Sequence, residues 1–290
     1  MSSELAIVIV SYNARADLSR TIASIVASPP ATPHQIVVVD NASSDGSLAE
    51  VRERWPEVLA IDAGANLGFA CANNLGIRAT GGEFVLLLNS DTVVPRGAID
   101  ALVAELRRHP DAAAAGPRLV DAKGRPEISF GRMIGPFNEL RQKAISALYD
   151  RGVRVARWHV DRQVHRARAV DWVSGACLLV RRADAEAVGL LDERFFLYTE
   201  DVDFCASLRG CGRAVRFVPD VEVRHLRGRS RAHDLGAAQA AYRRSHLAFY
   251  AKHHPAWHRI LYWYLRLKGQ LPEAGPPDDG PPAGESRPDG

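Results

Sequence analysis

Residues 5–13 read LAIVIVSYN, six apolar residues followed at once by Ser11, Tyr12 and Asn13. A continuous, largely β-branched apolar run is typical of a strand buried on both faces of a sheet. Further runs of this kind follow at Ile36–Val39, Val58–Ile61 and Phe84–Leu88. Stretches with apolar residues at helical spacing separate them. The sequence therefore predicts an α/β fold, with a mostly parallel sheet and helices on both faces.

The remaining elements are expected as follows. Helices in the first half are predicted at Arg15–Ala27, Ser47–Trp55, Asn66–Ala79 and Ile99–Arg108. After about residue 115 we expect strands at Ala112–Leu119, Val170–Val180, Val215–Val218 and Val221–His225. The later helices are predicted at Glu139–Tyr149, Ala183–Val188 and Ala237–His253, and Leu197–Arg209 is predicted to be a polar turn that leads into a helix. The Arg-rich residues 125–168 show little periodicity, which indicates a variable loop region around one helix. Residues 271–290 are almost devoid of apolar side chains, which predicts a disordered tail.

The composition is typical of a globular protein and does not indicate a particular binding partner. The chain has 290 residues, 47% of them hydrophobic, and a net charge of +3. Four cysteines in a chain this long do not form a disulfide framework, so we expect buried thiols in a reducing compartment. Neither a signal peptide nor an apolar stretch of about 20 residues is visible, which favours a cytoplasmic protein. We expect no nucleic-acid partner.

Basic side chains gather in two segments, 151–168 and 224–231. Each segment is either a solvated face or a surface for phosphates, of a ligand or of an anionic membrane. The aromatic and basic region Tyr242–Lys268 could join such a membrane surface. The alternative for Tyr262, Trp263 and Tyr264 is packing of a C-terminal helix on the core.

Polar clusters follow three of the predicted strands: Ser11-Tyr12-Asn13, Asp40-Asn41 and Asn89-Ser90-Asp91. Ligands of open α/β sheets bind beyond the carboxyl ends of the strands, so these clusters predict a site at one sheet edge. A carboxylate at the tip of a buried strand is costly unless it meets a cation or hydrogen-bond donors. Asp91 could hold Mg²⁺ or Mn²⁺, which would bridge two phosphates, or it could cap the following turn.

Three carboxylates, Glu200, Asp201 and Asp203, lie just ahead of an apolar helical pattern. The helix dipole favours acidic groups in a first turn, which explains one or two of them. We therefore expect divided roles, one carboxylate facing a ligand as a general base and another tying the helix to the fold. His225 ends a predicted strand, where it could bind metal or phosphate or be structural.

The Asn66–Ala70 segment, with Asn73 and Asn74 after it, makes a glycine-containing turn into a helix. Its N–H groups could bind an anion. The sequence lacks both GxGxxG and GxxxxGK[ST], which argues against the common dinucleotide-binding and P-loop folds.

Taken together, these motifs resemble the family 2 glycosyltransferases, and within them the bacterial rhamnosyltransferase-like branch. The similar segments are IVIVSYNARADLSRTIASI, VVVDNASSDGS, NLGFACANNLGI, FVLLLNSDTVV, VSGACLLVRR, FFLYTEDVDFCASLRGCG and VRHLRGRS, which cover roughly residues 5–230. The resemblance implies a GT-A fold, an inverting mechanism, a divalent metal and a nucleotide-diphosphate-sugar donor. It also implies a single domain over residues 1–270, with a nucleotide-binding half (1–115), an acceptor and catalytic half (116–235) and C-terminal helices (236–270).

The resemblance also implies roles for particular residues. The nucleotide side would be formed by Ser11, Tyr12, Asn13, Asp40, Asn41, Asn66, Gly68, Asn73, Asn89 and Ser90. Asn89 stands where the family has the first aspartate of its Asp-x-Asp motif, so Asp91 would carry the metal with His225. Asp201 of the Glu200-Asp201 pair would be the base. Trp172, Ser174 and Gly175 would line the donor and acceptor pocket.

The function expected from the resemblance is transfer of rhamnose from dTDP-rhamnose to a cell-envelope or polysaccharide acceptor, including a lipid-linked one. UDP-galactofuranose, UDP-GlcNAc or UDP-glucose are alternative donors. A non-catalytic sugar-nucleotide or glycan-binding module is a different class of protein, and the Glu200-Asp201 pair argues against it. A nucleotidyltransferase would need a Gly-rich basic loop near the N-terminus, which Ser11–Leu18 is not.

Overall fold

The computed structural model describes residues 3–127, 129–226 and 235–272. Its main sheet begins with the predicted buried strands β1 (Leu5–Ser11), β2 (His34–Asp40), β3 (Leu59–Asp62) and β4 (Phe84–Asn89). They run parallel in the order β3-β2-β1-β4, and all seven residues of β1 are buried. The predicted strands, and the α/β fold class they imply, are confirmed.

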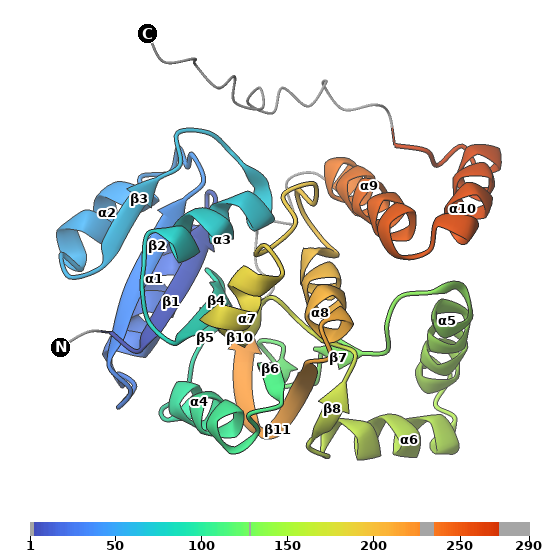
Figure 1. The fold of residues 1–290 in the computed structure, drawn as a ribbon, viewed down its shortest axis with the longest axis horizontal. Helices are drawn as coiled ribbons and strands as arrows, with labels where there is room; N and C mark the ends of the chain where they lie inside the picture. Colours follow the sequence, from blue (N-terminus) through green and yellow to red (C-terminus); the bar gives the residue numbers. More distant parts are fainter. Residues whose placement is uncertain (1–2, 128, 227–234, 273–290) are drawn as a thin grey trace, which may run out of the picture.

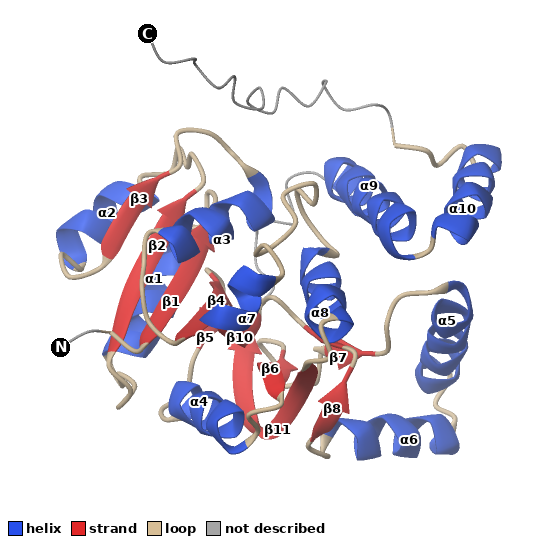
Figure 2. Ribbon diagram, viewed as in Figure 1, coloured by secondary structure: helices blue, strands red, loops and turns tan. Residues whose placement is uncertain are grey.

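Helices cover both faces of this sheet (Figure 2). On one face, α1 (Arg15–Val26), α2 (Ser47–Arg54) and α4 (Ala98–Arg108) pack in a core cluster with Leu5, Ile7 and Ile9 of β1. The other cluster joins Val8 and Val10 of β1 to α3 (Gly68–Arg78), α7 (Arg182–Ala187) and α8 (Glu200–Gly210). Alternate residues of one strand thus supply two cores, because successive side chains point to opposite faces.

The second half of the chain extends the sheet with mixed strand directions. Strand β10 (Cys177–Arg181) lies antiparallel between β4 and β6 (Ala112–Val120). Strand β11 (Ala214–His225) then pairs parallel with β6, and antiparallel with β5 (Thr92–Val93) and β8 (Arg168–Val170). Among the described residues the sheet has nine strands.

Two strand predictions need correction. The expected strand Val170–Val180 is divided into β8, β9 (Trp172–Val173) and β10. Strand β8 pairs with β11, whereas β9 belongs to a separate small sheet, and the chain then turns at Ser174, whose carbonyl accepts the Cys177 amide. Conversely, the two strands expected at Val215–Val218 and Val221–His225 form the single strand β11. Its register shifts between Val218 and Glu222, next to Pro219, which has no N–H to give to the ladder.

The Arg-rich segment contains more structure than expected. After the short strand β7 (Phe130–Gly131), which pairs with β9, come α5 (Pro136–Asp150) and α6 (Arg154–Val164). Helix α5 matches the predicted helix, but α6 was expected to be a loop. Arginine is a good helix former, so weak apolar periodicity does not prevent a surface helix.

The chain closes with α9 (Leu235–His253) and α10 (Pro255–Leu267). In the described part of the chain, no helix is long and apolar enough to cross a membrane. The predicted disordered tail lies almost wholly outside the described residues, as do Arg227, Arg229 and Arg231. The four cysteines are free thiols, and Cys177 and Cys205 are buried as expected, whereas Cys211 is exposed.

Gly76 marks the close approach of α3 to the sheet. A Cβ at this position would lie 2.6 Å from a methyl carbon of Val8 and 3.1 Å from one of Val39. We predict that Gly76→Ala destabilises the protein by about 1–2 kcal/mol, since overpacking outweighs the helix propensity gained. Chemical denaturation measures the free energy of unfolding.

Gly81→Ala is the matched control. A Cβ at Gly81 meets nothing within 4 Å, so its effect should stay within about 0.5 kcal/mol of zero. Equal stability of the Gly76→Ala variant and the wild-type protein would contradict this account of the helix–sheet contact.

Candidate active site

The three polar clusters predicted from the sequence meet at one edge of the sheet. Ser11 lies opposite Asp40 in the β1–β2 pair, and Val10 lies opposite Asn89 in the β1–β4 pair. The Asn41 amide donates to the Ser11 carbonyl at 2.8 Å, which continues the pairing beyond the strand ends. The carboxyl ends of β1, β2 and β4 therefore form a common polar edge, as expected.

Asp40 organises the turn after β2. Its carboxylate is 2% exposed and accepts the Ser43 amide at 2.9 Å and the Ser47 hydroxyl at 3.2 Å. Asn13, at φ +48°, ties the neighbouring loop to the same turn, because its side-chain oxygen accepts the Ser44 amide at 2.8 Å. Tyr12 beside it is 47% exposed. The structure thus gives Asp40 and Asn13 positioning roles and leaves the Tyr12 ring open to a ligand.

Asn41 anchors the entry to α3. Its side chain donates to Asn66 Oδ1 at 2.9 Å and accepts the Leu67 amide at 2.9 Å. Gly68 follows with φ +79°, and a Cβ there would lie 2.4 Å from the carbonyl oxygen of Phe196. The next amide, of Phe69, donates to that same oxygen at 2.7 Å. Only glycine fits this position, where the start of α3 meets the loop before α8.

Two predicted nucleotide-binding residues are fully buried. Asn73 donates to the Phe69 carbonyl at 2.8 Å, while its own Oδ1 is buried without a partner among the described residues. The Ser11 hydroxyl is likewise buried and without a partner in the described chain. Both polar atoms are buried in the described protein, and the contact of these side chains with a nucleotide stays a prediction.

Asp91 and His225 are brought together by the pairing of β5 with β11. His225 Nε2 lies 3.1 Å from Asp91 Oδ1 and 3.3 Å from Asn89 Nδ2, and its Nδ1 lies 3.1 Å from Glu127 Oε2. Burial lowers the pKa of His225, but hydrogen bonds and charge from Asp91 and Glu127 outweigh it and raise the pKa above the ordinary value of 6.5. Ser90 is held by its backbone, whose carbonyl accepts the Thr21 hydroxyl at 2.7 Å.

This cluster suits a cation that also has phosphate ligands. Among the described residues, no group of three or more His, Cys, Asp or Glu side chains is arranged to hold a metal ion by itself. Asp91 and His225 offer one carboxylate and one imidazole side by side. The carboxylate fits Mg²⁺ or Mn²⁺ in enzymes where one or two protein ligands are completed by substrate phosphates. The imidazole adds a nitrogen ligand, which a transition metal such as Mn²⁺ accepts more readily than Mg²⁺.

The second acidic centre lies at the start of α8. Asp201 Oδ2 accepts the Gly175 amide at 2.8 Å, and Oδ1 accepts the Val202 amide at 2.8 Å. Burial raises the pKa of Asp201 above its ordinary value, although these hydrogen bonds oppose the shift. Glu200 is 7% exposed, and its Oε2 has no partner in the described chain. Burial, with the charge of Asp201, raises the pKa of Glu200 well above 4.5.

A short backbone segment connects the two acidic centres. The Asn89 amide donates to the Ala176 carbonyl at 3.0 Å, and the preceding residue, Gly175, donates to Asp201. Gly175 packs closely on the candidate base, because a Cβ at this position would lie 3.2 Å from that of Asp201, a tight contact. The predicted pocket residues Ser174 and Gly175 are therefore beside the candidate base.

Trp172 is held on the far side of this segment. Its indole Nε1 donates to the Arg132 carbonyl at 2.9 Å, and a Cβ at Gly131 would lie 2.7 Å from the ring. Ser174 is fixed by its own amide, which donates to the Ser129 carbonyl at 2.9 Å. Of the three predicted pocket residues, Ser174 and Gly175 thus lie in the turn between β9 and β10, whereas Trp172 lies in β9 and is bound to the residue after β7.

Sequence reasoning missed several residues of this site. Glu127 lies in the aperiodic Arg-rich segment, and nothing near it signals that it would contact His225. Phe196 contacts α3 only through the tertiary fold.

The third carboxylate, Asp203, is 1% exposed and binds Lys252 Nζ at 2.8 Å and His253 Nε2 at 2.6 Å. The prediction that one carboxylate ties the helix to the fold is confirmed for Asp203.

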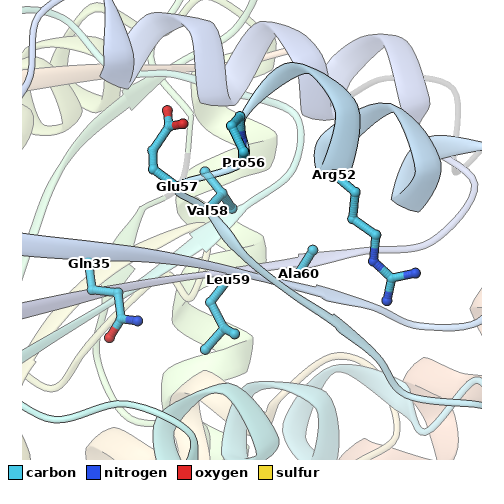
Figure 3. Close-up of a pocket in the computed structure, with 7 residues that line it drawn as sticks. All are labelled: Gln35, Arg52, Pro56, Glu57, Val58, Leu59 and Ala60. Carbon is cyan, nitrogen blue, oxygen red and sulfur yellow. The ribbon is translucent and has the colours of Figure 1, made fainter.

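A surface pocket elsewhere does not belong to this edge. It is lined by residues including Gln35, Arg52, Glu57 and Leu59 (Figure 3). Gln35 and Leu59 lie at the beginnings of β2 and β3, whereas Asp40 and Asn41 lie at the end of β2. The pocket is therefore at the opposite end of the strands from the acidic centres.

Comparison with known proteins agrees with this geometry. The profile of the family described as "Glycosyltransferase like family 2" matches residues 3–258. An N-acetylglucosaminyl-diphospho-decaprenol L-rhamnosyltransferase of Mycobacterium tuberculosis is 32% identical over 278 residues, which cover 92% of this chain and 90% of the relative. A low-salt glycan biosynthesis hexosyltransferase of Haloferax volcanii is 28% identical, with 72% of this chain and 62% of the relative covered.

Solved structures of glycosyltransferases share the fold. A mannosyltransferase from Pyrobaculum calidifontis, in complex with GDP-Man and Mn²⁺, has a TM-score of 0.59 at 19% identity, with 92% of this chain and 70% of that chain covered. GalNAc-T7, solved with UDP, GalNAc and Mn²⁺, has a TM-score of 0.57 at 17% identity, with 78% of this chain covered. The present chain spans 44% of the length of that protein.

The chain belongs to glycosyltransferase family 2. It is a glycosyltransferase with a GT-A fold, and rhamnosyltransferases are among its relatives. The expectations of an enzyme and of this family are confirmed, and the binding module and the nucleotidyltransferase are set aside.

The burial of Glu200 predicts an unusual dependence of stability on pH. Its pKa is raised in the folded protein, so folding takes up a proton, and stability falls as pH rises from about 4.5 through the folded pKa. Glu200→Gln removes the ionisable group. We expect this variant to be more stable than wild type at pH 7–8, with a rise in Tm of about 2–4 °C per kcal/mol gained.

The gain should become small near pH 4, where wild-type Glu200 is protonated in the folded state and mostly protonated in the unfolded state. Thermal unfolding of both proteins across this pH range measures the difference. A Glu200→Gln variant that is less stable at pH 8 would show that the carboxylate is satisfied in the folded protein.

Proposed function

We propose that this enzyme transfers rhamnose from dTDP-rhamnose, with inversion, to a lipid-linked or polysaccharide acceptor of the cell envelope. Asp201 acts as general base, and a divalent metal on Asp91 and His225 stabilises the leaving diphosphate. The observation that carries the proposal is the position of these two centres, one on each side of the Gly175–Ala176 segment. Displacement at the anomeric carbon needs a base on one face and a stabilised leaving group on the other.

The relatives support the choice of substrates. The mycobacterial relative is named for transfer of L-rhamnose to N-acetylglucosaminyl-diphospho-decaprenol, and it matches this chain over 90% of its own length. That name supports rhamnose as the transferred sugar and a polyprenyl-diphosphate glycan as the acceptor class. UDP-galactofuranose, UDP-GlcNAc and UDP-glucose remain the alternative donors, and one structural neighbour is solved in complex with UDP-GlcNAc.

Asp201 is suited to accept a proton. Its two oxygens each accept one backbone amide, which fixes the orientation of the carboxylate. A pKa raised by burial makes Asp201 a stronger base than an exposed aspartate. As the acceptor hydroxyl attacks the anomeric carbon, a new C–O bond forms, the bond to the donor diphosphate breaks, and the hydroxyl proton passes to Asp201. Attack opposite the leaving group inverts the configuration.

Asp91 and His225 would hold the metal ion, which when bound neutralises charge on the leaving diphosphate. Glu127 orients the imidazole, because Nδ1–H can donate a hydrogen bond to this carboxylate, and the lone pair of Nε2 would then be available to a metal ion shared with Asp91. The side-chain amide of Asn89 lies beside the imidazole at the same edge of the sheet. The exposed Tyr12 ring and the Asp40 turn would receive the nucleotide.

The role of Asp201 predicts a selective loss of turnover. Asp201→Asn should reduce transfer by about 10²–10⁴-fold, because the amide cannot take the proton, while donor affinity stays within about twofold of wild type. Transfer assays and calorimetry with the donor measure the two quantities. Asp220→Asn, the same change at an exposed position, is the matched control. Unchanged turnover of the Asp201→Asn variant would refute the base assignment.

The donor and the metal are tested together by ligand stabilisation. In Mg²⁺ or Mn²⁺, dTDP-rhamnose should raise Tm more than the three UDP-sugars do, and EDTA should abolish most of that rise. Asp91→Ala should lose the metal-dependent part, whereas Asp111→Ala, at an exposed position, should keep it. If a UDP-sugar raises Tm most, that sugar replaces dTDP-rhamnose as the proposed donor. If Asp91→Ala keeps the metal-dependent rise, Asp91 is not a metal ligand.

A further inference from the structure

Helix α10 carries an apolar stripe that the protein does not cover. Trp257, Ile260, Tyr264 and Leu267 are spaced three or four residues apart, so they share one face of the helix. Ile260 is 58%, Tyr264 55% and Leu267 86% exposed. Trp263, beside Ile260 and Leu267 on the same face, is 55% exposed. Trp263 and Tyr264, for which packing of a C-terminal helix on the core was the alternative interpretation, are more than half exposed, on a helix whose other face packs against the protein.

The opposite face of α10 anchors the helix to the enzyme. Leu265 is buried, and Leu261 packs against the cluster of Phe195, Val202, Phe249 and Tyr250. The carbonyl of Gln270, just after α10, accepts Arg243 of α9 at 3.1 Å. These contacts fix which face of α10 points outward, so the exposed stripe is a fixed feature of the folded protein. Figure 1 shows α10 outside α9 at the rim of the molecule.

Cations flank the stripe. The guanidinium of Arg266 lies 4.9 Å from the ring centroid of Trp263, and Lys268 Nζ lies 5.8 Å from that of Tyr264. Arg259 and Arg266 border one side of the stripe by helical spacing, and Lys268 borders the other. Residues 235–272 contain six Lys and Arg and no Asp or Glu, so their net charge is +6, twice the +3 of the whole chain. The rest of the chain is therefore net negative.

The stripe continues onto α5. The ring of Phe137 contacts that of Trp257 edge-on, with centroids 5.8 Å apart, and Phe137 is itself 73% exposed. Leu140, one turn further along α5, is 66% exposed. His254, just before α10, holds the two helices together, since its Nε2 lies 2.8 Å from the Ile134 carbonyl. We call the exposed side chains of α10 and the start of α5 the α10 face.

We propose that the α10 face docks the enzyme on an anionic lipid surface. An amphipathic helix with aromatic and aliphatic residues on one face and basic residues along its borders inserts in the interfacial layer of a bilayer. The aromatic rings match the headgroup level, and the cations match acidic headgroups. Nucleic acid would satisfy the cations but would leave Ile260 and Leu267 without an apolar environment.

The α10 face is mechanically linked to the candidate base. Helix α9, on which α10 packs, ends in Lys252 and His253, and both bind Asp203 of α8 two residues after Asp201. Ser245 of α9 also donates to the Leu197 carbonyl at 2.8 Å, in the loop before α8. If the proposed function is right, docking by this face would bring Asp201 to acceptors whose lipid anchor lies in the same membrane; that step rests on the proposed function.

Vesicle flotation of the purified protein tests the docking without donor or acceptor. The wild-type protein should bind vesicles of phosphatidylcholine and phosphatidylglycerol and bind pure phosphatidylcholine about tenfold or more weakly. Ile260→Ser with Trp263→Ser, and separately Arg259→Glu with Arg266→Glu, should each weaken binding to the anionic vesicles about tenfold or more. All four positions are partly or fully exposed, and circular dichroism and Tm should show intact folding.

Matched changes at a distant position are the controls. Val26→Ser and Arg52→Glu replace exposed side chains of α1 and α2, beyond the sheet from α10, and should leave vesicle binding unchanged. Equal loss in these controls, or no binding by the wild-type protein, would overturn the proposal. So would a dimer in light scattering that the Ile260→Ser and Trp263→Ser changes dissociate, because a second copy would then cover the face.

A transfer assay separates this proposal from the proposed function. The α10-face variants should transfer sugar normally to a short-chain, water-soluble acceptor and lose transfer to a long-chain acceptor in anionic vesicles. An enzyme that floats with vesicles but transfers no sugar would preserve the docking surface and refute the proposed function alone.

Discussion

The hydrogen bond from the Gly175 amide to Asp201 is the contact on which the arrangement of the site depends. It fixes the candidate base against a turn whose next residue, Ala176, accepts the Asn89 amide at the end of β4. One dipeptide therefore sets the separation between the base and the edge that carries Asp91. Because β10 runs antiparallel beside β4, that dipeptide emerges at the carboxyl end of β4, where the polar clusters lie. A parallel β10 would present its other end there.

The same region stores unfavourable energy. Glu200 is buried with an oxygen that has no partner in the described chain, and burial raises the pKa of both Glu200 and Asp201. Tyr198 and Thr199, just before α8, have φ of +69° and +71°, which costs on the order of 1 kcal/mol for each non-glycine residue. The Asp203 contacts with Lys252 and His253 oppose this strain, because they hold α8 in place from outside the site. Local instability at the base is thus offset by an ion pair and hydrogen bonds one helical turn away.

Local sequence pattern predicted the sheet well and the site only in part. The strands β1, β2 and β4 are buried on both faces, so each reveals itself by a continuous apolar run, and their carboxyl ends necessarily share one edge. The meeting of Asp91 with His225 depends on β11 pairing with β5 across more than a hundred residues, and residue patterns alone do not encode that pairing. Glu127 gave no signal at all. The direction of β10 was also hidden, since an apolar run looks the same in a parallel and an antiparallel neighbour. Helix α6 was not predicted, because arginine supports a helix without producing an apolar periodicity in the sequence.

Helix α9 connects two surfaces that the sequence presented as separate features. Some residues of α9 bind Asp203 and the loop before α8. Others hold α10, whose apolar stripe faces away from the protein. Asp203 then has a reason to differ from its two acidic neighbours: it is the attachment point for this helix pair. The fold divides a carboxylate cluster that looks uniform in sequence into the candidate base Asp201, its buried neighbour Glu200, and Asp203, which ties α8 to the C-terminal helices. Because the tie lies on the same helix as the base, the orientation of the α10 face and the position of Asp201 are set by one rigid element.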